Sequence, residues 1–223
     1  MRAIFLLFAM ALTACTPSSP PADNAILAIG DSVMAWNGGE GIPEVTGAAL
    51  GRPVVDASVS GARLSTGSVA GALGFEIGRQ VPGPGWDWII VTGGGNDIRP
   101  TCREAGAETA QDALIGPDLT GEIPALIARL RDTGAKVAFV GYYDGAEASP
   151  TGFAPCQPYF TTINRRLTAL SSRDPGLIFL DAGDVIDPAD RGLYDRDLIH
   201  PSPRGSAQIG AALADAIRAA EGR

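Results

Sequence analysis

The only histidine of this chain, His200, stands three residues after an aspartate, Asp197. Within one turn, that carboxylate can accept a hydrogen bond from the imidazole Nδ1–H, which sets the tautomer and leaves Nε2 as a base. Asp181, Asp184 and Asp195 are neighbouring alternatives for the orienting role. The spacing favours Asp197, and the pair predicts acid–base chemistry.

A serine, Ser32, follows Gly30 and Asp31 at the end of the first apolar run. A serine hydroxyl becomes a nucleophile only with a base in hydrogen-bond reach. A serine after a strand is also a common helix N-cap, and that alternative stays open. Because the chain has one histidine, any imidazole base for Ser32 must be His200.

Three glycines at 93–95 precede Asn96 and Asp97. Glycines let a ligand approach the backbone closely, and a side-chain amide there can donate to a developing oxyanion. A glycine-rich turn with a polar cap is the structural alternative. A phosphate-binding loop fits poorly, since no Lys and Ser/Thr follow at the required spacing.

The elements that must position these residues alternate along the chain. Short apolar runs between turn signals predict strands buried on both faces, at 25–29, 53–57, 86–92, 137–140 and 177–180. Apolar residues at helical spacing follow Ile123, Phe160 and Ile209, and the last helix is expected to begin with Ser202 as N-cap and Pro203 in its first turn.

This alternation predicts a single α/β domain over residues 25–223. We expect a doubly wound parallel sheet of about five strands with helices on both faces, similar to flavodoxin. Sites in such sheets lie in the loops after the strands. Ser32, Asn96 and His200 are therefore expected on one rim.

Four blocks in this order resemble the SGNH hydrolase superfamily, also called GDSL esterases or lipases. They are Gly30-Asp31-Ser32, the segment 56–61, Gly94-Gly95-Asn96-Asp97 and Asp197 to His200. The resemblance implies a Ser32, Asp197, His200 triad, and an oxyanion hole from the backbone N–H groups of Ser32 and Gly61 and the Asn96 amide. The second block begins with Asp56, where an Asn is common.

The resemblance implies cleavage of small acyl esters, acetyl or short-chain, without a metal or organic cofactor. Two alternatives stay open: an acyltransferase that passes the acyl group to a glycan hydroxyl, and a non-catalytic envelope binding module. Trp36, Arg99, Tyr142, Tyr143 and Asp144 fall in loops that could line an open, shallow substrate pocket, or simply pack there.

The first 24 residues read as targeting sequence. Residues 1–14 begin with Met1-Arg2 and continue in an uncharged apolar stretch, which predicts a signal peptide. Leu12-Thr13-Ala14-Cys15 resembles the lipobox of bacterial lipoproteins, which implies a lipidated Cys15. Residues 15–24 then form a flexible tether. We expect an exported, lipid-anchored envelope protein, sorted to the outer membrane and facing the periplasm; a plain signal peptide is the alternative.

Beyond the inner membrane, Cys102 and Cys156 could form a disulfide or remain buried thiols; their polar, loop-like surroundings favour the disulfide. The net charge of −8 argues against nucleic-acid binding. One His and three Cys exclude most zinc sites, and no apolar run reaches the ~20 residues that span a bilayer. Expected partners are a small ester or acylated glycan or lipid, and the membrane through the anchor, for a monomeric protein.

Overall fold

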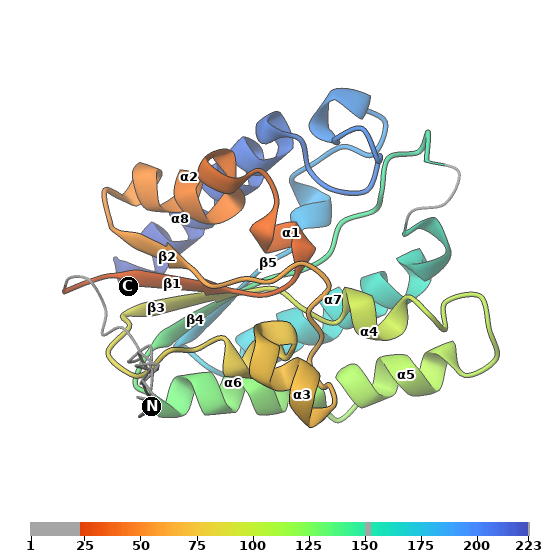
Figure 1. The fold of residues 1–223 in the computed structure, drawn as a ribbon, viewed down its shortest axis with the longest axis horizontal. Helices are drawn as coiled ribbons and strands as arrows, with labels where there is room; N and C mark the ends of the chain where they lie inside the picture. The colour runs from red at the N-terminus through yellow and green to blue at the C-terminus, as the bar shows by residue number, and fades with distance from the viewer. Residues whose placement is uncertain (1–22, 150–152, 223) are drawn as a thin grey trace, which may run out of the picture.

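Five parallel strands form the centre of the molecule, in the order β2-β1-β3-β4-β5 (Figure 1). The structure is a computed structural model that describes residues 23–149 and 153–222. The strands are β1 (Ile26–Ile29), β2 (Val54–Asp56), β3 (Trp88–Val91), β4 (Lys136–Val140) and β5 (Leu177–Leu180). Ile26 of β1 is in register with Val54 of β2 on one side and Trp88 of β3 on the other.

Helices cover both faces of this sheet. In Figure 1, α2 and α8 lie together on one face, and α5, α6 and α7 lie on the other. The helices are α1 (Ser32–Ala35), α2 (Ile42–Leu50), α3 (Ser68–Ala70), α4 (Gly95–Ile98), α5 (Ala107–Leu114), α6 (Glu122–Asp132), α7 (Gln157–Ser171) and α8 (Pro203–Glu221). The expected doubly wound α/β sheet is confirmed.

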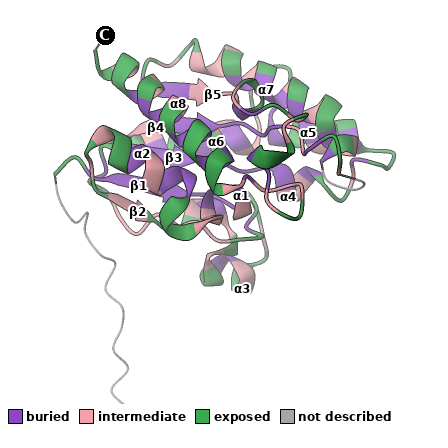
Figure 2. Ribbon diagram, turned by 90° about the horizontal axis from the view of Figure 1, so that it is seen from above, coloured by how far each residue is buried: buried purple, intermediate pink, exposed green. Residues whose placement is uncertain are grey.

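Burial differs between the central strands and the edges. Every residue of β1 and β3 is buried, and so is β4 after Lys136, which appears as a purple centre in Figure 2. The expectation that all five runs are buried on both faces is wrong for β2, which is partly to fully exposed, and for the end of β5. These two strands form the sheet edges, where each has only one neighbouring strand.

The three predicted helices are α6, α7 and α8. The Ser202 side chain caps α8 by accepting from the backbone N–H of Gly205, at 3.2 Å, and Pro203 is the first residue of the helix. Two further helices on the sheet faces, α2 and α5, were not among the predicted elements. Within the described residues, no helix has both the length and the hydropathy needed to cross a bilayer.

The predicted signal peptide, the lipidation site Cys15 and the tether as far as residue 22 lie outside the described residues. Their processing and anchoring therefore remain predictions from the sequence.

Candidate active site

Ser32 begins helix α1 at the carboxyl end of the central strand β1. The turn between them needs a glycine, because Gly30 has φ +148° and a Cβ there would lie 2.8 Å from the carbonyl oxygen of Thr92. Asp31, rather than Ser32, is the helix N-cap: its side chain accepts from the backbone N–H of Val33 at 3.0 Å. The Ser32 hydroxyl is therefore not used as a cap.

The imidazole of His200 connects Ser32 to Asp197. Its Nε2 lies 2.8 Å from the Oγ of Ser32, and its Nδ1 lies 2.5 Å from Oδ2 of Asp197. Both contacts are within hydrogen-bond reach, so the geometry suits proton transfer from the hydroxyl to Nε2. Residues 168 positions apart in the chain thus form one linear arrangement.

The other oxygen of Asp197 is held by its own turn. Oδ1 accepts from the backbone N–H groups of Ile199 and His200, each at 3.0 Å. Burial raises the pKa of this carboxyl, but the hydrogen bonds from the His200 side chain and the two N–H groups outweigh it and leave the pKa below its usual value. Asp197 is thus an anion when His200 acts as a base.

Two of the competing carboxylates, those of Asp195 and Asp181, have other partners. Oδ2 of Asp195 accepts from the indole N–H of Trp36 at 2.7 Å. Asp181 caps the turn at residues 182–184 by accepting from Gly183, and it also accepts from Asn164. Among the described side chains, Asp197 is the carboxylate that contacts the imidazole.

Asn96 and Asp97, in α4 after strand β3, hold the segment that contains Gly61. The Asn96 amide donates to the carbonyl of Ala62 at 3.0 Å, and Asp97 accepts from the backbone N–H of Leu64 at 3.2 Å. Gly61 is exposed and has φ +84°, a conformation that favours glycine. An Asn amide has two N–H donors, so one remains for an oxyanion.

Two acidic residues near this segment have raised pKa values. Burial is the main cause for Asp97, and the pKa rises to about 6 although Leu64 donates to the carboxylate. Burial also raises the pKa of Asp56, which keeps a turn by accepting from both the N–H and the hydroxyl of Ser58. The second block begins with Asp56 where an asparagine is more common, and this aspartate still forms the hydrogen bonds that hold the turn.

Next to Ser32, a buried hydrogen bond runs from the Tyr142 hydroxyl to Oδ2 of Asp31. Burial raises the pKa of both groups. Tyr142 also stacks on Phe160 at 4.8 Å between ring centroids, and Tyr143 is buried as well. Both tyrosines lie just after strand β4 ends at Val140, and their side chains are buried; Tyr142 also borders a surface pocket that Asp144 lines, away from Ser32.

The other predicted pocket residues lie in different places. Arg99 is exposed beside the disulfide between Cys102 and Cys156, and Asp144 accepts from the Gln157 side chain. Trp36 stacks on the imidazole of His200, with 3.9 Å between ring centroids and 9° between planes. The sequence indicated that Trp36 was near the site but not that it contacts the base.

The disulfide joins two segments 54 residues apart, with 4.9 Å between the Cα atoms of Cys102 and Cys156. It connects the chain after α4 to the turn that leads into α7. Both cysteines are buried, although the polar, loop-like sequence around them does not predict burial.

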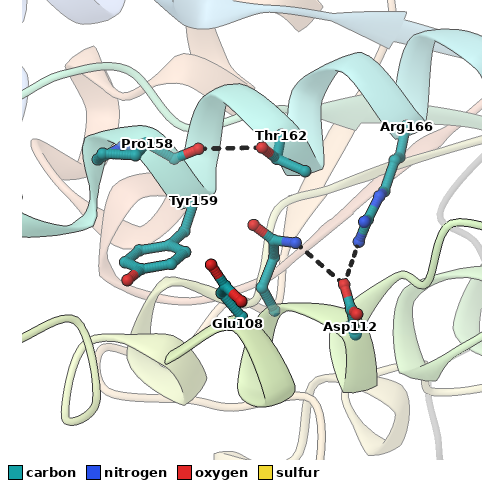
Figure 3. Close-up of a pocket in the computed structure, with 7 residues that line it drawn as sticks. Glu108, Asp112, Pro158, Tyr159, Thr162 and Arg166 are labelled. Carbon is teal, nitrogen blue, oxygen red and sulfur yellow. Dashed lines mark hydrogen bonds and ion pairs between the residues drawn. The ribbon is translucent and has the colours of Figure 1, made fainter. Parts of the chain in front are cut away.

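A separate surface pocket of about 340 Å³ lies between α5 and α7 (Figure 3). Its wall contains an ion pair between Arg166 and Asp112, and Glu108 and Tyr159 face the same space. None of its lining residues belongs to the Ser32–His200–Asp197 arrangement. The pocket is therefore distinct from the candidate active site, where Ser32 and His200 are partly exposed.

Solved structures similar to this chain share its fold. A protein from Slackia heliotrinireducens assigned to the SGNH hydrolases has a TM-score of 0.61 and 17% identity, covering 88% of this chain and 100% of its own. The lipase Lip_vut3 from a goat rumen metagenome has a TM-score of 0.58 and 21% identity, over 88% and 96%. The psychrotrophic esterase EstA from Pseudoalteromonas has a TM-score of 0.57 and 19% identity, over 90% and 100%.

No curated protein sequence matches this chain. Residues 28–208 match the model of the GDSL-like lipase/acylhydrolase family. This range includes Ser32, Gly61, Asn96 and the Asp197–His200 turn, and it is most of the chain. The resemblance inferred from the four sequence blocks is confirmed, and the chain belongs to the GDSL-like lipase/acylhydrolase family, a family of carboxylic ester hydrolases.

Proposed function

We propose that this protein is a serine esterase that hydrolyses esters of small acyl groups, acetyl or short-chain, on an open site. The observation that carries the proposal is the continuous contact from Ser32 Oγ through His200 to Asp197, at 2.8 and 2.5 Å. Its parts are a nucleophile, a base and an orienting anion, which is the minimum set for acyl transfer through a covalent intermediate.

The reaction follows from these positions. Ser32 Oγ attacks the ester carbonyl while His200 Nε2 takes its proton, and Asp197 stabilises the resulting imidazolium. The N–H groups of Ser32 and Gly61 and the Asn96 amide stabilise the tetrahedral oxyanion. The alcohol then leaves with the proton from His200, and a water activated by His200 releases the acid from Ser32.

An exposed apolar segment next to Gly61 supports an acyl group that includes a short hydrocarbon chain. Val69 and Leu73 are 75% and 67% exposed, and Phe75 is 38% exposed. Phe75 adjoins the proposed oxyanion hole, because a Cβ on Gly61 would lie 3.9 Å from its Cε1. A chain on the carbonyl carbon could cover part of this surface, whereas an acetyl methyl group is too short to do so.

The test is hydrolysis of p-nitrophenyl esters of increasing chain length by the purified protein. Ser32→Ala and His200→Ala are expected to lower kcat by at least ~10³, because both belong to one catalytic unit. A serine-directed fluorophosphonate is expected to label Ser32; EstA from Pseudoalteromonas, with the same fold, is described as inhibited by monoethylphosphonate. Unchanged hydrolysis in either variant would show that the triad assignment is wrong.

The same residues could transfer the acyl group to a sugar hydroxyl instead of water. Ser32 and His200 are partly exposed, which supports this acyltransferase as the second candidate, since an acceptor could reach the acyl-enzyme. Product analysis with an acylated donor and a glycan acceptor separates the two: a new glycan ester indicates transfer, and free acid alone indicates hydrolysis. A non-catalytic binding module is expected to give neither product and no Ser32 adduct.

We also propose that the protein acts at the bacterial envelope, held by lipid on Cys15. The sequence Leu12-Thr13-Ala14-Cys15 and the tether after it support this anchor. Cys15→Ala is expected to release the protein from membranes in cell fractionation. Retention of that variant in the membrane fraction would contradict the anchor.

A further inference from the structure

Trp36 covers one face of the imidazole that the proposed reaction uses. The indole and the His200 ring are parallel within 9°, with 3.9 Å between centroids. Trp36 comes directly after α1, the short helix that begins with Ser32. One segment of five residues thus contacts His200 twice, through the Ser32 hydroxyl at the ring edge and through the indole at the ring face.

The indole is itself attached to the turn that carries the histidine. Its Nε1–H donates to Oδ2 of Asp195 at 2.7 Å. The backbone N–H of Asp195 donates to the carbonyl of His200 at 2.8 Å, so the two residues belong to one closed turn. The indole therefore contacts this turn at two points, the imidazole face and the Asp195 carboxylate.

The next residue strengthens the same connection. The Asn37 side chain donates to the carbonyl of Pro201 and to the hydroxyl of Ser206, each at 2.9 Å. Asn37 adopts φ +70°, in the left-handed region. The segment 36–37 thus ties the nucleophile helix to the residues before and after His200.

We propose that Trp36 is a positioning residue for His200, acting through the stacked ring and held in place by Asp195. The proposal rests on the proposed function, since it concerns the base of that reaction. The hydrogen bond to Asp197 fixes only one edge of the imidazole, and the ring could swing about that contact. The indole face prevents this movement and keeps Nε2 directed at Ser32.

The stacked indole also stabilises a positive charge on the imidazole. When Ser32 loses its proton, the imidazole becomes a cation, and the face of an indole attracts a cation at this distance. The acidic groups around the ring are Asp197 on the same turn and Asp31, buried before Ser32. Asp195 lies at the edge of the indole, where it accepts from the Nε1–H. The indole therefore stabilises the imidazolium more than the neutral ring, which lowers the barrier to attack by Ser32.

This role differs from substrate binding, which the sequence suggested for Trp36. A residue that binds ester raises KM when it is removed, whereas one that positions the base lowers kcat. The rate of fluorophosphonate labelling of Ser32 adds a second measure, because it depends on activation of the serine and needs no natural substrate.

The experiment compares Trp36→Leu with Trp36→Phe in the full chain. Trp36→Leu is expected to lower kcat and the labelling rate by about 10- to 30-fold, the size of a cation–π contribution in a partly desolvated site, with KM changed less than about threefold. Trp36→Phe keeps an aromatic face and is expected to recover most of the loss. Tyr159→Leu, on α7 away from the triad, is the control and is expected to behave as wild type.

Asp195 gives an independent test that keeps the indole. Asp195→Asn keeps one carbonyl oxygen that can accept from the indole N–H and is expected to stay near wild type. Asp195→Ala is expected to lower kcat about three- to tenfold, because it removes the partner of the indole and also that of the Arg196 backbone N–H, which donates to Oδ1 at 2.6 Å. If Trp36→Leu does not fold, the comparison of Asp195→Asn with Asp195→Ala still tests the positioning role of Trp36.

Three outcomes would overturn the proposal: a Trp36→Leu variant with raised KM and normal kcat, one with both constants unchanged, or a folded Trp36→Phe variant as slow as Trp36→Leu. The proposed function fails separately, if Ser32→Ala still hydrolyses the ester. An active wild type with an inactive Ser32→Ala and a normal Trp36→Leu would refute only the role of Trp36.

Discussion

At the scale of single residues, the Asn96 amide has one N–H in a structural hydrogen bond and a second N–H for the proposed oxyanion hole. One N–H holds the carbonyl of Ala62, and the other is available to an oxyanion. Asn96→Ala is expected to lower kcat by about 10²–10³ with little change in KM, because the lost donor acts on the transition state. Steady-state kinetics with a short-chain ester measure this, and a change in KM alone would argue against the oxyanion role.

Asp97 makes stability depend on pH. Its pKa is about 6 in the folded protein, above the value of 3.8 for an unperturbed aspartate, so the folded state holds the proton more tightly than the unfolded state. Its contribution to stability is therefore fully present below pH ~4 and is lost as the pH rises through 6. Asp97→Asn keeps an acceptor for Leu64 and removes the titration.

The measurement is urea unfolding of wild type and Asp97→Asn at pH 4 and pH 7. Between these values, wild type is expected to lose about 2 kcal/mol relative to the variant, less than the whole shift implies because the carboxylate is only partly buried. A difference between the two proteins that is the same at both pH values would contradict the raised pKa.

At the scale of elements, the segment from α3 to Phe75 lies in the connection between β2 and β3, and its apolar side chains Val69, Leu73 and Phe75 are exposed. Gln80 ties it to the nucleophile turn, since its side chain donates to the carbonyls of Gly74 and Gly30, each at 2.9 Å. The segment is thus connected to the turn before Ser32 through Gln80, and it lies beside Gly61 through Phe75.

Leu73→Ser tests the chain-length preference. Leu73 is 67% exposed, so the fold does not depend on it, and the variant is expected to unfold at the temperature of wild type. With p-nitrophenyl hexanoate, kcat/KM is expected to fall about three- to tenfold, because a few methylene contacts are lost. With p-nitrophenyl acetate it is expected to stay unchanged. An equal loss with both esters would mean that the segment does not contact the chain.

The elements that the sequence predicted correctly are those with strong local patterns. The apolar runs of β1 and β3 and the stripes of α6 to α8 are regular enough to be identified alone. Helix α2 was missed because Gly47 and Pro43 weaken its pattern. Gly47 is needed there: a Cβ would lie 2.3 Å from the side chain of Val54, on the neighbouring edge strand β2.

At the scale of the whole molecule, the Cys102–Cys156 disulfide closes a long loop that contains α5, α6 and β4 and ends just before α7. Such a loop is expected to contribute about 4 kcal/mol by restricting the unfolded chain. The double variant Cys102→Ser/Cys156→Ser is expected to unfold at lower urea concentration and, while folded, to keep its kcat, because the triad is built from other segments.

Unfolding curves and kinetics of the double variant and the reduced wild type check this expectation. Equal stability of the oxidised and reduced protein would show that the disulfide does not contribute to the free energy of unfolding. A loss of kcat in the folded variant would show that the bond supports the site.

The sequence by itself determined the strand–helix alternation, the blocks around Ser32, Gly61 and Asn96, and His200 as the candidate for an imidazole base, since the chain has one histidine. These features depend on residue type and local spacing. Only the tertiary structure decided that Trp36 lies on the imidazole face and that Tyr142 and Tyr143 point into the core. Such contacts depend on how distant segments pack, and an aromatic side chain in a loop gives no local signal of the partner it will meet.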